Sequence, residues 1–323
     1  MDGRGHAVFS ESARVTRAVR WTLTSLGAMC LSCGGAPQGL TEPSALPTGN
    51  RAVTLSGPDA TVTALPTEIV VAAGDIAQCA GGVPQATARL VDAIDGSILA
   101  LGDNAYPSGT ADNYRTCYDA TWGRYKARTR PVPGNHEYDS SSTAEPYFDY
   151  FGAIAGPPGS GFYSYDLGNW HVVALNSNIA VGSRSAQAAW LRSDLAANPA
   201  RCTLAYWHFP LFSSSKHGNI EQMREFWNIL YDAGADVVLG AHDHVYERFA
   251  PQDPDGAADP AGIREFVVGT GGAAPYPFVT VRPNSEVRLS QNGVLRLALK
   301  AGGYDWTFIP VSGAGDSGSA PCH

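Results

Sequence analysis

The chain has 323 residues, enough to bury a substantial core, and we expect a single catalytic domain. Its 22 Lys and Arg stand against 30 Asp and Glu, a formal charge of -8 without a basic stripe, so nucleic acid is excluded as an expected partner. A hydrophobic content of 44% with 36 Gly and 22 Pro is typical of a loop-rich globular protein and excludes a disordered or coiled chain.

Residues 1–33 have the character of an export signal. Three arginines precede a modest apolar run, Trp21–Leu31, that is too short to span a bilayer. The segment around Cys33 weakly resembles a bacterial lipoprotein cleavage box in which Cys33 carries the lipid, and ordinary signal cleavage nearby is an equally good interpretation. We therefore expect an exported protein, either secreted, periplasmic or lipid-anchored at the cell envelope. Membrane contact is expected only through Cys33, and no oligomeric state is indicated.

Four cysteines follow this signal, an even number that an oxidising compartment would pair. They are Cys79, Cys117, Cys202 and Cys322. Three connectivities are possible. We favour Cys79 with Cys117, because both follow strand-end loops that should be neighbours, and this leaves Cys202 with Cys322. The alternative is four unpaired thiols.

Residues 34–65 are rich in Pro, Gly and Thr without periodicity, which predicts a flexible linker, and the folded domain is expected over 66–323. An apolar run at Ile69–Val71 leads to Gly74 and Asp75, as in a strand covered on both faces. Helical spacing over Ala86–Ile94 then leads into a second strand at Ser97. Together these segments predict a right-handed βαβ unit.

The second strand ends in Gly102 and Asp103, with Tyr106 three residues later. Glycine lets the backbone turn sharply at the strand end. A tyrosine-rich stretch up to Lys126 is predicted to be helical. Two prolines then force an extended approach to a loop that carries Asn135 and His136.

A hairpin pattern follows, because Gly161–Leu167 and Trp170–Leu175 flank a Gly-Asn turn. The sheet is therefore predicted to be mixed. Ser185–Ala197 is predicted to be a helix, with Ala189, Trp190 and Leu195 on its buried side.

A strand over 203–207 delivers His208, and a strand over 236–240 delivers His242 and His244. Between them, apolar residues recur at helical spacing from Ile220 to Tyr231, and Gly234 is the expected C-cap. Later strands are predicted over 263–268, 294–299 and 305–311. Their short lengths and Gly-rich turns predict a second sheet packed on the first.

Five strand ends thus present oxygen and imidazole donors at the edge where open α/β sheets place functional groups. The mixture suits Fe, Mn or Zn; Ca would use oxygen alone, and a thiolate site would need cysteines. About seven donors are too many for one tetrahedral ion and fit two ions that share a carboxylate. The donors are Asp75, Asp103, Tyr106, Asn135, His208, His242 and His244.

On these blocks the chain resembles the calcineurin-like metallophosphoesterase family, and specifically the small bacterial type of its purple acid phosphatase branch. The matching blocks, in order, are Gly74-Asp75, Gly102–Tyr106, Gly134–Glu137, His208 after Ala205–Trp207, and His242–His244 followed by Val245–Arg248. The resemblance implies a four-layer αββα sandwich. Its two mixed β-sheets would be flanked by helices, with the metal ligands on loops at the carboxyl ends of strands.

The resemblance also implies two metal ions. The first would be held by Asp75, Asp103, Tyr106 and His244, and the second by Asp103, Asn135, His208 and His242, with Asp103 as the bridge. The family uses Fe(III) at the first site, where bound tyrosinate gives a purple colour, and Fe, Zn or Mn at the second.

Two positions depart from the family pattern. Ala77 replaces the last glycine of Gly-Asp-x-Gly, and Ala241 stands where a glycine often precedes the histidine pair. Each adds a methyl group near a tight turn. We expect small adjustments rather than lost ligands.

The implied activity is that of an acid phosphatase, a hydrolase that acts on small phosphomonoesters by in-line attack of a metal-bound hydroxide. His136 and His217 are the candidates for protonating the leaving alcohol, and with Asn135 they are the candidates for substrate binding. The family often carries a second histidine where this chain has Gly218. A packed structural role for His136 and an exposed loop position for His217 are the alternatives.

Two other functions are carried as alternatives. One is a phosphodiesterase on the same scaffold. The other is a non-catalytic phosphate-binding or sensing module, whose sign would be a missing ligand, and no ligand is missing from the sequence.

Overall fold

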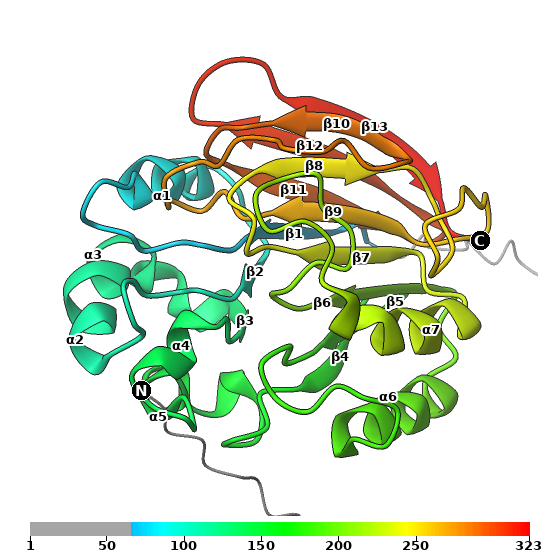
Figure 1. The fold of residues 1–323 in the computed structure, drawn as a ribbon, viewed down its shortest axis with the longest axis horizontal. Coiled ribbons are helices and arrows are strands. Elements are labelled where there is room, and N and C mark those ends of the chain that lie inside the picture. Colours follow the sequence, from blue (N-terminus) through cyan, green and yellow to red (C-terminus); the bar gives the residue numbers. More distant parts are fainter. Residues whose placement is uncertain (1–65) are drawn as a thin grey trace, which may run out of the picture. The chain divides into compact units, whose positions relative to one another are not determined.

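Two β-sheets packed face to face form the centre of the fold, and helices cover the outer face of each (Figure 1). The computed structural model describes residues 66–323. The predicted signal 1–33, with its candidate lipid site Cys33, and the predicted linker 34–65 lie outside the described residues. The four-layer αββα architecture predicted from the sequence is confirmed.

The first sheet has six strands, of which β1, β2 and β3 run parallel and the rest antiparallel. In spatial order the strands are β13 (Asp316–Pro321), β12 (Gly303–Pro310), β11 (Gly293–Lys300), β1 (Glu68–Ala73), β2 (Ser97–Leu101) and β3 (Thr129–Val132).

The second sheet has seven strands, and it is mixed as predicted, because β5, β6, β7 and β9 run parallel while β4, β8 and β10 are antiparallel to their neighbours. In spatial order the strands are β10 (Ser285–Leu289), β8 (Tyr246–Phe249), β9 (Arg264–Val268), β7 (Val237–Gly240), β6 (Cys202–Tyr206), β5 (Trp170–Ala174) and β4 (Tyr163–Leu167).

The helices divide into two groups by the sheet that they cover (Figure 1). Those on the six-stranded sheet are α1 (Pro84–Asp92), α2 (Ala111–Asn113), α3 (Asp119–Thr121), α4 (His136–Asp139) and α5 (Glu145–Phe151), with the short π or 3-10 turns η1 (Tyr114–Tyr118), η2 (Gly123–Arg128) and η3 (Gly152–Ala155). Those on the seven-stranded sheet are α6 (Ala186–Ala197), the turn η4 (Glu221–Met223) and α7 (Arg224–Asp232). The tyrosine-rich stretch is thus helical as predicted, but in short pieces rather than as one helix.

Apolar side chains fill three layers, one between the sheets and one under each group of helices. Val70 faces the layer between the sheets, and its neighbour Val71 faces the layer under α1. Successive residues of a strand point to opposite faces, so a strand that is covered on both sides must be apolar throughout. This explains why β1 reads as a continuous apolar run.

The predicted buried face of α6 is confirmed in part. Trp190 and Leu195 are partly buried and pack against the apolar layer under α6 and α7, but Ala189 is exposed. The fully buried residues of the helix are Gln187, Ala188 and Leu191. The Gln187 amide accepts a hydrogen bond from the backbone N–H of Asn176 at 2.7 Å and donates one to its carbonyl at 2.9 Å. These two bonds fix the rotation of the helix about its axis, a constraint that apolar spacing does not record.

Both predicted disulfides are present, Cys79 with Cys117 and Cys202 with Cys322. The first joins the loop after β1 to η1. The second joins β6 of one sheet to the residue after β13 of the other. Among the described residues, no helix has the length and apolar character needed to cross a membrane.

Candidate metal centre

The predicted ligands lie on loops that leave the carboxyl ends of β1, β2 and β3 in one sheet and of β6 and β7 in the other. Backbone hydrogen bonds continue past the strands: the Asp75 N–H donates to Gly102 at 3.0 Å, and the Ala241 N–H donates to His208 at 2.8 Å. The Gly74 N–H donates to Val268 of the other sheet at 2.9 Å. The two sheets therefore meet at this end and hold five loops together.

Three of the predicted ligands have left-handed backbone conformations. Asp75, Asp103 and His242 have φ angles of 56°, 49° and 67°, a region of backbone conformation that residues other than glycine seldom adopt. Gly134 must be glycine, because a Cβ there would lie 2.1 Å from Asp103 Oδ1. Such backbone strain persists where the surrounding structure fixes it, and it concentrates at functional sites.

The four ligands predicted for the first metal meet at the hydroxyl of Tyr106. Tyr106 Oη lies 2.7 Å from Asp75 Oδ1 and 3.2 Å from both Asp103 Oδ2 and His244 Nε2. His244 Nε2 lies 3.2 Å from Asp75 Oδ1, and its Nδ1 faces the Ala274 carbonyl at 2.9 Å. That contact directs Nε2 toward the carboxylates.

The four ligands predicted for the second metal also converge. His208 Nε2 lies 3.3 Å from Asp103 Oδ2 and 3.2 Å from Asn135 Oδ1, while its Nδ1 faces the Leu101 carbonyl at 2.9 Å. Donor atoms of Asp103, His208 and His242 lie within 4.8 Å of one another. Asp103 thus borders both groups of ligands.

The charges of this cluster fit bound cations. Asp75 and Asp103 are 0% and 1% exposed, and among residues 66–323 no lysine or arginine pairs with either carboxylate. Their ionic partners are imidazoles, above all those of the predicted ligands His208 and His244, and a bound cation would replace the protons of these rings in compensating the buried charges. Burial and the neighbouring His208 lower the pKa of His242 to about 3, which keeps this imidazole neutral and ready to bind a metal.

Opposing effects set the pKa values of the other ligands. Burial would raise the pKa of Asp75, but the charges of His244 and His208 outweigh it and hold that pKa well below the usual range. Burial would lower the pKa of His208, but Asp103 raises it to about 9. Burial and the charges of Asp75 and Asp103 raise the pKa of the Tyr106 phenol well above 10.0, so ionising this phenol requires a strongly charged cation.

The two candidate acids border the cluster and are about one-third exposed. The His136 ring lies 4.5 Å from that of Tyr106, and its Nε2 is 3.7 Å from Asp103 Oδ2. The His217 ring stacks on that of His242 with centroids 4.3 Å apart, and its Nδ1 lies 3.0 Å from Asp243 Oδ1. The structure thus brings every predicted site residue to one place.

Glu137 organises the ligand loops, and sequence reasoning missed this role. Its side chain is fully buried and accepts hydrogen bonds from the N–H groups of Asn104 at 2.9 Å and Gly134 at 2.7 Å, and from Tyr114 Oη at 3.0 Å. Burial, with a contribution from Asp103, raises its pKa to about 7.

Asp243 is the second residue that sequence reasoning missed. It is buried and accepts two hydrogen bonds, one from the backbone N–H of His217 at 3.0 Å and one from Ser213 Oγ. Both missed residues lie inside the blocks Asn-His-Glu and His-Asp-His, and that position was the available signal.

The two departures from the family pattern are accommodated without loss of a ligand. A Cβ on Gly74 would lie 2.4 Å from Ala241 Cβ, so the Ala241 methyl group fills the space that this glycine leaves. Ala77 is buried and pairs with Ala105 across the two ligand loops.

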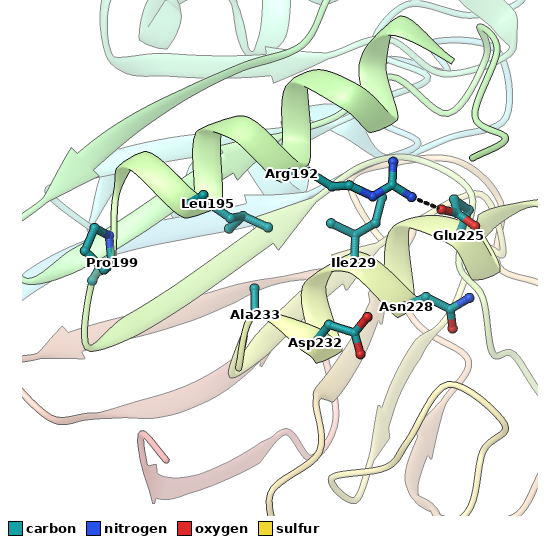
Figure 2. A pocket seen from close by; sticks show the side chains of 10 residues that line it. Arg192, Leu195, Pro199, Glu225, Asn228, Ile229, Asp232 and Ala233 are labelled. Atoms are coloured by element: carbon teal, nitrogen blue, oxygen red, sulfur yellow. Dashed lines mark hydrogen bonds and ion pairs between the residues drawn. The ribbon is translucent and has the colours of Figure 1, made fainter. Parts of the chain in front are cut away.

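A separate cavity of about 540 Å³ lies between α6 and α7 (Figure 2). The ion pair of Arg192 and Glu225 crosses it, and Leu195 and Ile229 line it. It contains none of the predicted site residues.

Known proteins resemble this chain in sequence. Purple acid phosphatase 15 of Arabidopsis thaliana is 31% identical over 211 residues, which cover 54% of this chain and 40% of the relative. Purple acid phosphatase 21 of the same plant is 33% identical over 210 residues, covering 58% and 47%. Human acid phosphatase type 7 is 28% identical over 257 residues, covering 64% and 55%. The chain thus spans about half the length of these relatives, or less.

Solved structures share the fold. A purple acid phosphatase from yellow lupin seeds superposes with a TM-score of 0.64 at 18% identity, covering 79% of this chain and 54% of that one. A dimetal phosphatase from Danio rerio superposes with a TM-score of 0.53 at 12% identity, covering 80% and 100%.

The model of the calcineurin-like phosphoesterase family matches residues 68–246. The match begins with β1 and ends just after His244, so it contains every predicted ligand. The chain therefore belongs to the calcineurin-like phosphoesterase family, and its curated relatives are purple acid phosphatases.

Proposed function

We propose that this chain is a dinuclear-metal phosphate ester hydrolase, an acid phosphatase that acts on phosphomonoesters. The observation that carries the proposal is the convergence of seven residues with oxygen or nitrogen donors from five loops. Two of the seven are buried carboxylates that no lysine or arginine of residues 66–323 neutralises. The family match supports the same chemistry.

Two metal ions are proposed, Fe(III) held by Asp75, Asp103, Tyr106 and His244, and Fe, Zn or Mn held by Asp103, Asn135, His208 and His242. When bound, such ions supply a nucleophile at mild pH and neutralise charge on the phosphoryl oxygens. The phenol supports iron at the first position, because burial keeps Tyr106 protonated unless a strongly charged ion displaces its proton.

The protein's own groups would complete the reaction. His217 directs Nδ1 at Asp243, which leaves Nε2 to protonate the leaving alcohol. His136 borders Asp103 and Tyr106 and would bind the phosphoryl group together with Asn135. Glu137 would hold the ligand loops in place through its bonds to backbone N–H groups.

We also propose export of the protein, with a signal over 1–33, a linker over 34–65 and the catalytic domain over 66–323. The two disulfides support this, because disulfides persist in oxidising compartments.

Metal analysis, an absorption spectrum and two substrates test the proposal. We expect two metal ions per chain including iron, a visible band, and faster hydrolysis of p-nitrophenyl phosphate than of bis-p-nitrophenyl phosphate. The reverse substrate preference would support a phosphodiesterase. Metal-loaded protein that hydrolyses neither substrate would support a phosphate-binding module.

A further inference from the structure

Lys216 and Tyr276 lie beside the metal centre, next to His217. The Tyr276 ring stacks on the ring of His244, with centroids 3.9 Å apart and planes inclined by 12°, and it meets the His217 ring edge to face at 5.5 Å. Lys216 Nζ lies over the Tyr276 ring, 4.3 Å from its centroid. Because His244 covers one face of the ring, the ammonium occupies the other.

Hydrogen bonds to the backbone hold the two segments that carry these side chains beside the ligands. The Tyr276 N–H donates to the His244 carbonyl at 3.0 Å, and Ser290 Oγ donates to the Tyr276 carbonyl at 2.6 Å. Ser215 Oγ donates to the Pro277 carbonyl at 3.1 Å, which ties the segment before Lys216 to the segment after Tyr276. The two segments are therefore held next to each other, and the contact of the ammonium with the ring completes the pair.

Both polar ends are available to a ligand. Lys216 is exposed, and within the part of the chain that the structure describes no carboxylate lies within ion-pair distance of its ammonium. Tyr276 is partly exposed, and its hydroxyl has no hydrogen-bond partner among residues 66–323. In a chain of formal charge -8, an unpaired cation beside the proposed phosphate site attracts an anion to that place.

We propose that Lys216 and Tyr276 form an anion subsite that binds a second acidic group of the substrate. The Tyr276 ring separates the ammonium from His244. The ammonium therefore suits a substrate group that is a few bonds away from the scissile phosphate. The preferred substrates are then phosphomonoesters with a second anionic group. This inference rests on the proposed phosphatase function.

Two alkyl phosphates that differ in one group test the subsite. 3-Phosphoglycerate carries a carboxylate where glycerol 3-phosphate carries a hydroxymethyl group. We expect the wild-type protein to favour 3-phosphoglycerate by about tenfold in kcat/KM, which is the scale of one charge-assisted hydrogen bond. Lys216→Met should abolish this preference and leave glycerol 3-phosphate within about twofold of wild type. Equal effects on both substrates, or none, would overturn the proposal.

The chain offers a matched control. Lys126 Nζ lies over the Tyr150 ring at the same 4.3 Å, and neither residue contacts a predicted ligand. Lys126→Met should leave kcat/KM unchanged for both substrates. Tyr276→Phe keeps the stacked ring but removes the hydroxyl, and it should reduce the preference only in part.

A binding measurement separates this inference from the proposed function. Phosphonoacetate and methylphosphonate are not phosphate esters and differ in a carboxylate. Calorimetric titration of the purified protein should show phosphonoacetate binding about tenfold more tightly in wild type and equally in Lys216→Met. A protein that hydrolyses no ester but shows this difference would refute the phosphatase and retain the subsite. A protein that hydrolyses esters but binds both phosphonates equally would refute the subsite alone.

Discussion

Asp103 borders both groups of ligands, and its replacement tests the bridging role. Asp103→Asn keeps the volume of the side chain and suits the left-handed backbone, which asparagine tolerates. The loss of the shared charge should lower bound metal and reduce kcat/KM by about 1000-fold or more, while circular dichroism stays unchanged. Metal analysis beside steady-state kinetics checks this. Full metal content with a near-normal rate would refute the bridging role.

Tyr106→Phe tests the ferric site through colour. Since the phenol is one ligand among several, the variant should lose the visible band but retain some hydrolysis. Tyr125→Phe is the control, because Tyr125 is also buried but bonds to Ala88 and Asp92, away from the cluster. A colourless iron-loaded wild type, or a band that survives Tyr106→Phe, would contradict the assignment.

His217→Ala tests acid catalysis by comparing leaving groups. An alkoxide needs a proton and p-nitrophenolate hardly does, so kcat/KM should fall by about 100-fold on an alkyl phosphate and far less on p-nitrophenyl phosphate. Equal losses would indicate phosphate binding instead. Unchanged rates would mean that the contact of His217 with Asp243 only stabilises the loop that carries His217 and has no part in catalysis.

Four of the ligands could be predicted because Asp75, Asp103, His208 and His242 each lie two residues past the end of a strand with a legible apolar run. The other three, Tyr106, Asn135 and His244, lie farther from such a run, and the motif blocks shared with the family supported them.

Glu137 and Asp243 could not be predicted. Glu137 accepts hydrogen bonds from the backbone N–H groups of two ligand loops, and Asp243 accepts one from the backbone N–H of His217. These donors come from loops that are separate in the sequence, so the pairing depends on how the loops meet in the fold.

At the level of elements, predictability followed the sequence pattern of each strand. β1, β2 and β7 are covered on both faces and form apolar runs, whereas β8, β10 and β13 were missed. β10 and β13 are edge strands with polar residues, as expected of strands that must not pair with another chain. In β8, Glu247 and Arg248 interrupt the apolar pattern, and their partners lie in other elements.

One of those partners, Asp316, connects the two sheets. On β13 of the six-stranded sheet, it accepts hydrogen bonds from Tyr246 and Arg248 of the other sheet, both at 2.7 Å, and from Trp306 at 3.0 Å. Burial would raise the pKa of Asp316, but the bonds from Arg248 and Tyr246 outweigh it and hold the pKa below 3.8.

Asp316→Asn should therefore destabilise the domain in a pH-dependent way. A carboxyl whose pKa is lower in the folded chain stabilises above its unfolded pKa and loses that effect as the pH falls through the folded value. At pH 7 the variant should lose about 1–3 kcal/mol of unfolding free energy, since it removes one of the two carboxylates, Asp316 and Glu286, that pair with the largely buried Arg248. The difference from wild type should shrink as the pH falls below 4, as measured by denaturant unfolding.

Asp305→Asn is the control for that experiment. Asp305 pairs with Lys300 at 2.6 Å, but both side chains are at least one-third exposed. An exposed pair contributes only about 0–1 kcal/mol, so this variant should stay close to wild type. A loss equal to that of Asp316→Asn would show that the link between the sheets has no special role.

At the scale of the domain, the resemblance to the family implied four layers and two mixed sheets, and the apolar runs of the strands agree with that architecture. Continuous apolar strands require cover on both faces, and only stacked layers provide it. The order of strands could not be predicted. β11 pairs with β1 although about two hundred residues separate them, and that pairing depends on which edges remain free once the parallel strands have formed.

The two disulfides test whether domain stability and the metal centre can be separated. Cys202–Cys322 has a sequence separation of 120 and joins the two sheets, whereas Cys79–Cys117 has a separation of 38. Replacing the first pair with alanines should lower the free energy of unfolding by about 3–5 kcal/mol and replacing the second by about 2–4, because a longer closed loop restricts the unfolded chain more.

For metal binding, the loss of Cys79–Cys117 should have the larger effect and the loss of Cys202–Cys322 the smaller, the reverse of their effects on stability. Cys79 follows Asp75 by four residues, and Cys117 Sγ lies 3.2 Å from the carbonyl of Ala77, so this bridge holds the loop that carries the first ligand. Its loss should weaken metal affinity several-fold, as measured by competition with a chelator under conditions where every variant is folded. Cys202 begins β6, whereas the ligand His208 follows the opposite, carboxyl end of that strand, so loss of Cys202–Cys322 should leave that affinity unchanged. If both variants lose affinity in proportion to their stability, the metal centre depends on the rigidity of the whole domain, and the local bridge has no role of its own.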